Sequence, residues 1–255
     1  MHILISNDDG IDAPGIKALA QKLSEDNKVT VVAPSREQSG VGHSITYSSP
    51  IYSRSKSFPV KGVTAYAVDG SPVDCVKFAA CVLLKEKIDL VVSGINQGSN
   101  IGVDIFPSGT VNAAIAGVLQ GIPSIAVSLA DFESDDFSAC AELAAKLVRF
   151  VEDHPVPHGV LLNLNVPALP LNEIKGVCVV PMDSSGYPFH YETRKNPAKR
   201  EYHWLVCDRV VSRGDEMPAN DCDAMDRGYA SITPLKIDLS DYEYMEELKR
   251  TGLFL

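Results

Sequence analysis

The chain has 255 residues, of which 45% are hydrophobic and 22% are charged, and its formal net charge is -10. This composition can build a sizeable core and lies outside the range typical of disordered chains. The acidic total argues against broad binding to nucleic-acid polymers or anionic membranes, because their surfaces repel a net anion.

The amino-terminal segment and the cysteines indicate in which cellular compartment to expect the protein. Met1–Ser6 has no basic segment, and its apolar run is too short for a signal peptide. No later stretch reaches the roughly 18 apolar residues of a membrane span. The six cysteines, at positions 75, 81, 140, 178, 207 and 222, form no C-x-x-C pair. We therefore expect a cytoplasmic protein whose cysteines are buried free thiols.

Short β-branched runs alternate with helical patterns over the first half of the chain. Ser71 and Pro72 open one of the helical patterns with a capping hydroxyl and an N1 proline. Alternation of this kind predicts an α/β fold with a mostly parallel sheet covered on both faces. The expected strands are Ile3–Ile5, Val29–Val32, Thr64–Val68, Leu90–Val92 and Ser124–Val127, and the expected helices span about 14–24, 72–86, 110–120 and 136–153.

The last third of the chain has a different pattern of predicted elements. The run Gly159–Val166 is followed by shorter predicted strands at Val177–Pro181, Trp204–Val211 and Tyr229–Thr233. Ser240–Glu243 reads as a capping box that opens a final amphipathic helix. We expect a single domain over 1–255, with a core over 1–170 and a β-rich extension and helix over 171–255 that take part in oligomer contacts. The alternative is a last helix that folds back on its own domain.

In open parallel sheets, ligands bind beyond the carboxyl ends of the strands, and the segment after the first strand is acidic there. It reads Ser6-Asn7-Asp8-Asp9-Gly10. Two carboxylates about 4 Å apart would repel by about 4 kcal/mol at an effective dielectric of 20, which favours a shared proton or a bound cation. Oxygen ligands suit Mg²⁺ or Mn²⁺. The alternative is a plain turn in which Asp8 or Asp9 caps the next helix.

Two further strand ends carry candidate ligand loops. Pro34–Ser44 is rich in glycine and hydroxyl residues, which let backbone amides approach an anion. In Ser93–Asn112, the side chain of Asn96 offers a neutral oxygen to a cation. Ser108-Gly109-Thr110 opens an alanine-rich helix, whose first unpaired amides form a phosphate site. The alternative is an ordinary N-cap at Ser108.

Other common site types do not fit. Gly10 and Gly15 have P-loop spacing, but Ile16 replaces the lysine, and no G-x-G-x-x-G follows the first strand. The histidines at 43, 154, 158, 190 and 203 have no zinc-binding spacing. His43 lies in the second loop, where it could reach a leaving group, or it is merely structural.

The ordered motifs resemble the SurE survival-protein family of metal-dependent 5'/3'-nucleotidases, and the likeness covers nearly the whole chain. Two positions depart from the pattern we expect for that family: Ala116 stands where an acidic residue precedes Gly117, and Pro107 replaces an aromatic residue or histidine. The matching segments are Ile5–Ile11, Ser39–Ile45, Val68–Cys75, Ser93–Asn100, Ser108–Thr110, Asp221–Ala224 and Gly228–Leu235.

The resemblance implies one divalent cation per subunit, held by Asp8, Asp9, Ser39 and Asn96. It also implies a Rossmann-like αβα core, a protruding hairpin and a C-terminal segment exchanged between subunits of a homodimer or homotetramer. We expect the substrate and its phosphate to contact residues of the second and third loops, namely Gly40, His43, Asn100, Ser108, Gly109 and Thr110.

The predicted reaction is hydrolysis of nucleoside 5'- or 3'-monophosphates, and of short polyphosphate as a further candidate, by cation-activated water. Asp8 or Asp9 would orient or deprotonate that water. One rival is a phosphatase that forms an aspartyl phosphate on Asp8, although such enzymes use D-x-D and here the aspartates are adjacent. The other is a regulatory module that binds nucleotides without turnover.

Overall fold

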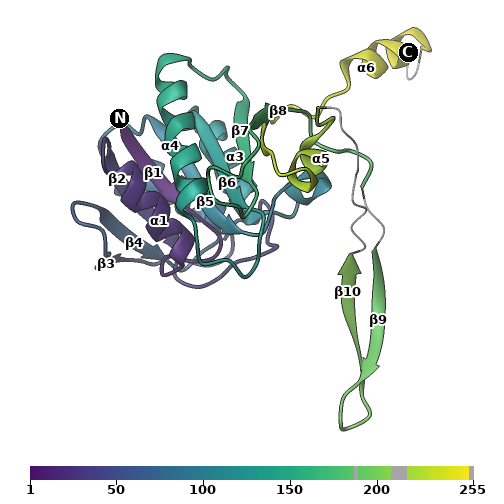
Figure 1. Cartoon of the computed structure of the whole chain (residues 1–255), viewed down its shortest axis with the longest axis horizontal. Coiled ribbons are helices and arrows are strands. Elements are labelled where there is room, and N and C mark those ends of the chain that lie inside the picture. The colour runs from purple at the N-terminus through teal and green to yellow at the C-terminus, as the bar shows by residue number, and fades with distance from the viewer. Residues whose placement is uncertain (187–188, 208–216, 253–255) are drawn as a thin grey trace.

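The computed structural model describes residues 1–186, 189–207 and 217–252 and shows a layered body with a long hairpin arm (Figure 1). The strands are β1 His2–Ser6, β2 Lys28–Pro34, β3 Ser53–Lys56, β4 Thr64–Val68, β5 Leu90–Gln97, β6 Ser124–Leu129, β7 Val160–Val166, β8 Val177–Val179, β9 Phe189–Lys195, β10 Glu201–Cys207 and β11 Ala230–Lys236. The helices are α1 Pro14–Leu23, α2 Pro72–Phe78, η1 Ala79–Leu83, η2 Gly102–Ile105, α3 Gly109–Leu119, α4 Ser138–Asp153, α5 Asp221–Asp226 and α6 Tyr242–Arg250.

Within the described ranges, the main sheet has nine strands in the order β3-β4-β2-β1-β5-β6-β7-β11-β8. Most neighbouring pairs are parallel, and the exceptions are β3 with β4 and β11 with β7. The predicted α/β class with a mostly parallel sheet is confirmed. The parallel strands β1, β2, β5 and β6 end at the same edge of this sheet.

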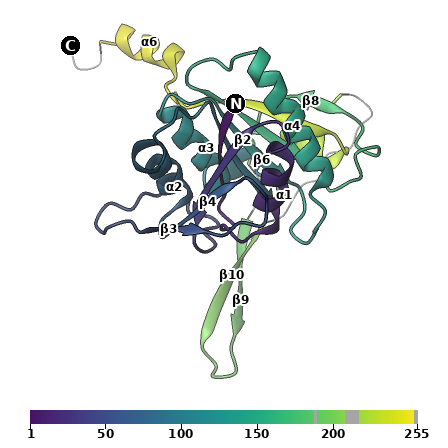
Figure 2. The same ribbon diagram turned by 90° about the vertical axis from the view of Figure 1, so that its left-hand side faces the viewer.

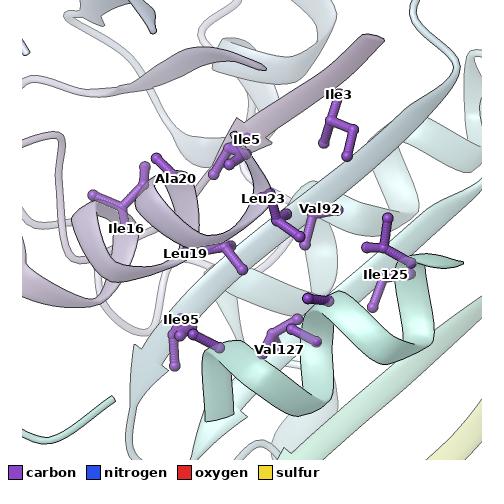
Figure 3. Close-up of a cluster of buried hydrophobic side chains, with 14 of the residues drawn as sticks. Ile3, Ile5, Ile16, Leu19, Ala20, Leu23, Val92, Ile95, Ile125 and Val127 are labelled. Carbon is purple, nitrogen blue, oxygen red and sulfur yellow. The ribbon is translucent and has the colours of Figure 1, made fainter. Parts of the chain in front are cut away.

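Helices cover both faces of the sheet, which gives the Rossmann-like αβα arrangement that the sequence predicts. On one face, α1 and α4 pack against the strands in a cluster that includes Leu19, Ile5 and Val127 (Figure 3). The buried side chains of α1 follow the helical period, at Ile16, Leu19, Ala20 and Leu23. On the other face, α2 and α3 pack against Leu4, Val32 and Val91.

Several element boundaries differ from those predicted. Ser71 caps α2 and forms a capping box with Asp74, as the sequence suggests, but α2 ends at Phe78. The amide of Leu84 bonds to the Ala79 carbonyl five residues back, so the chain continues as a π-turn instead of as a helix to residue 86. Apolar periodicity does not register that change in winding.

Strands are present after residue 170 with corrected limits, but β8 and β11 join the main sheet, and within the described residues only the hairpin of β9 and β10 lies outside it. β8 ends at Val179, two residues short of the predicted end. The predicted strand Trp204–Val211 is observed as Glu201–Cys207, and residues 208–211 lie outside the described ranges. The sequence analysis missed β3 and β9, because their exposed strands lack a buried, alternating face.

The arm and the last helix leave the body. Among the strands that the structure describes, β9 and β10 pair only with each other, in an antiparallel hairpin. Figure 2 shows the arm and α6 pointing away from the sheet in different directions. Asp241, and not Ser240, caps α6, and no α6 side chain is buried. The alternative of a helix folded back on its own domain is therefore wrong for this conformation.

The cysteine side chains that the structure describes are not uniformly buried. Cys75, Cys140 and Cys178 are buried, whereas Cys222 is half-buried and Cys81, on the η1 turn at the surface, is exposed. The prediction of buried thiols is wrong for Cys81, and the side chain of Cys207 lies outside the described ones. Among the described residues, no helix combines the length and apolar character needed to span a bilayer.

Candidate active site

The first candidate ligands lie where β1 ends. β1 is fully buried, and the chain turns directly after it, with the Asn7 side-chain amide donating to the Gly10 carbonyl over 2.9 Å. Gly10 has a φ of +97°, a conformation that favours glycine. Asp8 is 4% exposed and Asp9 is half-buried. Ala13 occupies the N-cap of α1 without a side-chain bond, so the alternative in which Asp8 or Asp9 caps that helix is wrong.

The amino terminus of α3 packs directly on Asp8. The hydroxyl of Thr110 donates to Asp8 Oδ1. Gly109 makes the approach possible, because a Cβ at that position would lie 2.6 Å from the Cβ of Asp8. Ser108 is the N-cap of α3, and its hydroxyl accepts from the Val111 amide over 3.0 Å. The N-cap alternative thus holds for Ser108, while Gly109 and Thr110 face the carboxylate.

Burial disfavours charge on both carboxyls, and the charge of Asp8 adds to this effect at Asp9. Burial raises the pKa of Asp8, and hydrogen bonds from Thr110 and the Gly109 backbone oppose that rise. The pKa of Asp9 is raised to about 7, first by burial and then by the charge of Asp8, with a smaller contribution from Glu37. The backbone of Gln97 at the end of β5 acts in the opposite direction on Asp9. A bound cation would offset the repulsion that contributes to the Asp9 shift and would favour the charged form of both carboxyls.

The other two predicted metal ligands lie on the adjoining strand ends. The Asn96 side-chain NH₂ donates to the Gly98 carbonyl over 2.7 Å, which leaves its oxygen as the atom for a cation. The Gln38 amide donates to the Asp8 carbonyl over 2.7 Å, so the loop after β2 begins against Asp8. Ser39 follows it, exposed, with its hydroxyl donating to Glu37 Oε1 over 2.9 Å.

The predicted substrate contacts of the second loop continue along the same segment. Gly40 is exposed and has a φ of +72°. The Gly42 amide donates to the Pro107 carbonyl over 2.8 Å, and His43 Nδ1 lies 3.1 Å from Asn112 Oδ1. The structure therefore joins the second loop to the turn that precedes α3. The sequence analysis did not identify Asn112, because nothing in its local sequence indicates a partner 69 residues away.

Asn100 is held by a polar patch beneath the third loop. Its side chain donates to Ser128 Oγ over 2.8 Å, and its backbone carbonyl accepts from the side chains of Asn163 and Asn165. The sequence analysis missed both asparagines. Two asparagines two residues apart in the buried strand β7 put polar groups on one face, and that pattern was the available signal.

Asp221 anchors the chain just beyond Asn100. This fully buried carboxylate accepts from the Gly102 amide over 2.9 Å and from the Asp183 amide over 2.8 Å. The motif that contains Asp221 was part of the family resemblance, but its role as an anchor was not foreseen. It links the third loop to the segment that leads into the arm.

The donor chemistry at the end of β1 suits a hard divalent cation. Over residues 1–186, 189–207 and 217–252, no group of three or more His, Cys, Asp and Glu side chains is placed to hold a metal ion. The predicted set has only two carboxylates, completed by a hydroxyl and an amide oxygen. Oxygen donors of this kind are those that Mg²⁺ and Mn²⁺ accept.

Comparison with known proteins places the chain in a family. The family model described as "Survival protein SurE" matches residues 3–187. A protein of Moorella thermoacetica named 5'-nucleotidase SurE is 44% identical over 100% of this chain and 97% of its own length. One of Carboxydothermus hydrogenoformans with the same name is 43% identical over 98% of this chain and 95% of its own length. The crystal structure of a SurE protein from Aquifex aeolicus superposes with a TM-score of 0.85 at 37% identity, covering 99% of this chain and 100% of that one.

The motifs identified in the sequence, the family model and the superposition on a SurE structure agree with one another. The resemblance inferred from Asp8, Asp9 and the loops that surround them is confirmed at the level of the family. The chain belongs to the SurE survival-protein family.

Proposed function

We propose that this protein is a 5'-nucleotidase that hydrolyses nucleoside monophosphates to nucleoside and phosphate. The observation that carries the proposal is the contact between Asp8 at the end of β1 and the first turn of α3. It puts the buried carboxyl of Asp8, next to the half-buried Asp9, beside a helix amino terminus, which favours anions. Relatives at 43% and 44% identity over nearly their whole length are named 5'-nucleotidases, which supports the same activity here.

A divalent cation, Mg²⁺ or Mn²⁺, is part of the proposal. Asp8, Asp9, Ser39 and Asn96 would hold it, one ion per subunit. When bound, it would lower the pKa of a coordinated water and neutralise charge on the phosphoryl oxygens. The raised pKa values support this assignment, because burial disfavours charge on both carboxyls and the charge of Asp8 adds to this at Asp9, which a counter-ion would offset.

Residues of this chain would bind the phosphate and accept the proton of the attacking water. The backbone amides of Gly109 and Thr110, with Asn100, would bind the non-bridging phosphoryl oxygens and orient phosphorus for in-line attack. Asp8 is deeply buried and has Oδ1 occupied by Thr110, so we assign the proton from the attacking water to Asp9. The water oxygen would bond to phosphorus as the ester P–O bond breaks, and the leaving alkoxide would take a proton from solvent water.

A phosphate-release panel tests the proposal. The protein is incubated with 5'- and 3'-monophosphates of each base and with short polyphosphate, in Mn²⁺, in Mg²⁺ and in excess EDTA. We expect release from the 5'-monophosphates that needs a divalent cation and stops with EDTA. No release under any condition, together with nucleotide binding by calorimetry, would instead support a regulatory module without turnover.

A homodimer, or a tetramer built from dimers, is the second part of the proposal. The arm has no core of its own, and Tyr191 is 63% and Trp204 60% exposed on opposite faces of the hairpin. An isolated two-stranded hairpin is only marginally stable in water. We propose that residues 171–255, through the arm and α6, contact a second copy of the chain. A monomer by light scattering at micromolar concentration would contradict this part alone.

A further inference from the structure

Asn112, in the first turn of α3, has an amide group whose orientation is fixed by its neighbours. Its Nδ2 lies 3.3 Å from the Ile105 carbonyl oxygen, 3.0 Å from that of Phe106 and 2.8 Å from that of Ser108. Carbonyl oxygens only accept hydrogen bonds, so the group among them must be the NH₂. The other end of the amide, Oδ1, is an acceptor, and it points at His43.

This orientation decides which nitrogen of His43 carries the proton. His43 Nδ1 lies 3.1 Å from Asn112 Oδ1, and two acceptors cannot share a hydrogen bond. We infer that Asn112 is a positioning residue that holds His43 in the Nδ1–H tautomer, so that the neutral ring presents Nε2 as an acceptor. The tautomer of a histidine ring is set by its hydrogen-bond partners, and the partner of Nδ1 here is an acceptor.

The backbone on both sides of His43 is held by hydrogen bonds to other elements, and these bonds keep the loop, and with it the ring, next to Asn112. On one side, the Gly42 amide donates to the Pro107 carbonyl over 2.8 Å. On the other, the Thr46 amide donates to the carboxylate of Asp74 over 3.0 Å, and Ser71 Oγ donates to the Ser44 carbonyl over 2.6 Å. His43 therefore meets Asn112 from a loop anchored to both α2 and the turn before α3.

The tautomer matters for the chemistry of the site, and this consequence rests on the proposed function. His43 is exposed, so Nε2 is the ring atom available to solvent or to a ligand. With Nδ1 committed to Asn112, a neutral His43 can accept a hydrogen bond from a substrate hydroxyl or from water. The Nε2–H tautomer would put a donor there instead. Asn112 thus fixes what kind of partner His43 can bind.

Nuclear magnetic resonance reads the tautomer directly and needs no turnover. In ¹⁵N-labelled protein, a long-range ¹H–¹⁵N spectrum separates protonated from unprotonated ring nitrogens, and a His43→Gln sample assigns the His43 signals. At the alkaline end of a titration, we expect Nδ1 to be protonated and Nε2 to be bare. A neutral ring protonated at Nε2 in the parent protein would overturn the inference, whether or not the protein is a nucleotidase.

Two substitutions at one position separate the tautomer from general packing. Asn112→Leu removes the acceptor, and we expect His43 to shift toward the Nε2–H form. Asn112→Asp keeps an acceptor for Nδ1 but loses the bonds to the three carbonyls, and we expect it to keep the Nδ1–H form. An unchanged tautomer in Asn112→Leu, or loss of the Nδ1–H form in Asn112→Asp, would contradict the assignment.

A double-mutant cycle then links the tautomer to the reaction. We expect Asn112→Leu to lower kcat/KM about 10-fold in the parent protein, as loss of a residue that orients a ligand does. In a His43→Ala background, the same change should have little further effect, because Asn112 acts through that ring. Equal losses in both backgrounds would show that Asn112 acts independently of His43.

Discussion

The hydroxyl of Thr110 in the first turn of α3 donates a hydrogen bond to Asp8 Oδ1 at the end of β1, joining residues 102 positions apart. Asp8 is only 4% exposed, so this bond replaces water around a buried carboxyl group. It also sets the helix amino terminus against the strand end. The geometry of the candidate site therefore depends on a contact between a strand and a distant helix.

Thr110→Val removes that hydroxyl while keeping the shape of the side chain. We expect stability to fall by about 1–3 kcal/mol, because a buried polar group loses its partner. We also expect kcat/KM to fall about 10-fold or more, because Asp8 loses the group that orients it. Chemical denaturation and steady-state kinetics measure the two effects. Thr110→Ser keeps the hydroxyl, and a loss as large as that of Thr110→Val would disprove the role of this bond.

Asp8→Asn and Asp9→Asn are expected to reduce turnover by about 10²-fold or more without unfolding the protein. Each change removes a proposed charged ligand, and Asp9→Asn also removes the proposed base, while the amide keeps the size of the carboxylate. Phosphate release in saturating Mn²⁺ and circular dichroism spectra report activity and fold. If either variant kept near-parent turnover, the assignment of that aspartate would be wrong.

The raised pKa of Asp9 predicts how stability without metal depends on pH. Its ordinary pKa of 3.8 becomes about 7 in the folded protein, so the folded state holds this proton more tightly than the unfolded state does. The stability that the protonated carboxyl supplies is complete below about pH 4 and is lost as the pH rises through 7. Asp9→Asn has no carboxyl to titrate at this position, so this loss of stability with rising pH does not occur in it.

Thermal unfolding in EDTA from about pH 5 to pH 8 measures this difference. We expect Asp9→Asn to become progressively more stable than the parent as the pH rises, by at least about 3 °C at the upper end. Saturating Mn²⁺ should reverse the order, because only the parent offers both carboxylates. A constant difference between the two proteins across the pH range would contradict the shift.

Gly109→Ala tests the close approach of α3 to Asp8. The added Cβ would lie 2.6 Å from the Cβ of Asp8 and 2.8 Å from Oδ2, so one of the two elements must move. We expect a large loss of kcat/KM, of about 10²-fold, because a displacement near 1 Å is costly at a reacting centre. Steady-state kinetics and a crystal structure of the variant give the loss and the movement.

Gly62→Ala is the matched control for that substitution. Gly62 has a φ of +83° at an exposed turn with open space around it. An alanine there is strained by about 1–2 kcal/mol, but it lies outside the candidate site. We expect lower stability with unchanged kcat. Parent-like activity in Gly109→Ala would show that α3 does not constrain Asp8.

Leu205→Asp tests whether the arm contacts another copy of the chain. Leu205 is 54% exposed on the hairpin and pairs across it with Tyr191. A charge placed in an apolar interface is costly, so we expect the oligomer to dissociate toward monomers in light scattering. Phe150→Asp, at a residue of equal exposure on α4, should leave the assembly intact. An oligomer unaffected by Leu205→Asp would argue against the arm as the interface.

The sequence predicted the elements whose burial leaves a pattern. β1 and β4 appear as short apolar runs, and α1 shows both its N1 proline and its helical spacing. Asp8 and Asp9 could be placed because they follow such a strand. The arm could not be delimited in this way, since β9 is exposed along its whole length and carries no alternation between buried and exposed positions.

The sequence identified individual residues of the site but not the contacts between them. Asp8, Asn96 and Thr110 stand at strand or helix ends, where local sequence marks them. The bond from Thr110 to Asp8 and the pairing of His43 with Asn112 arise from the packing of α3 against the sheet. Local sequence does not indicate which residues far apart in the chain come into contact, which is why Asn112 was missed.

Five consecutive positions at the start of α3, residues 108–112, each contribute something different. They supply the cap, the space for Asp8, a hydrogen bond to Asp8, the amide that donates to the cap, and an anchor for the preceding turn. An α-helix rotates by about 100° per residue. A single insertion or deletion just before Ser108 would therefore point every one of these groups in a new direction at once. Changes of length should be tolerated elsewhere in the chain far more readily than in this turn.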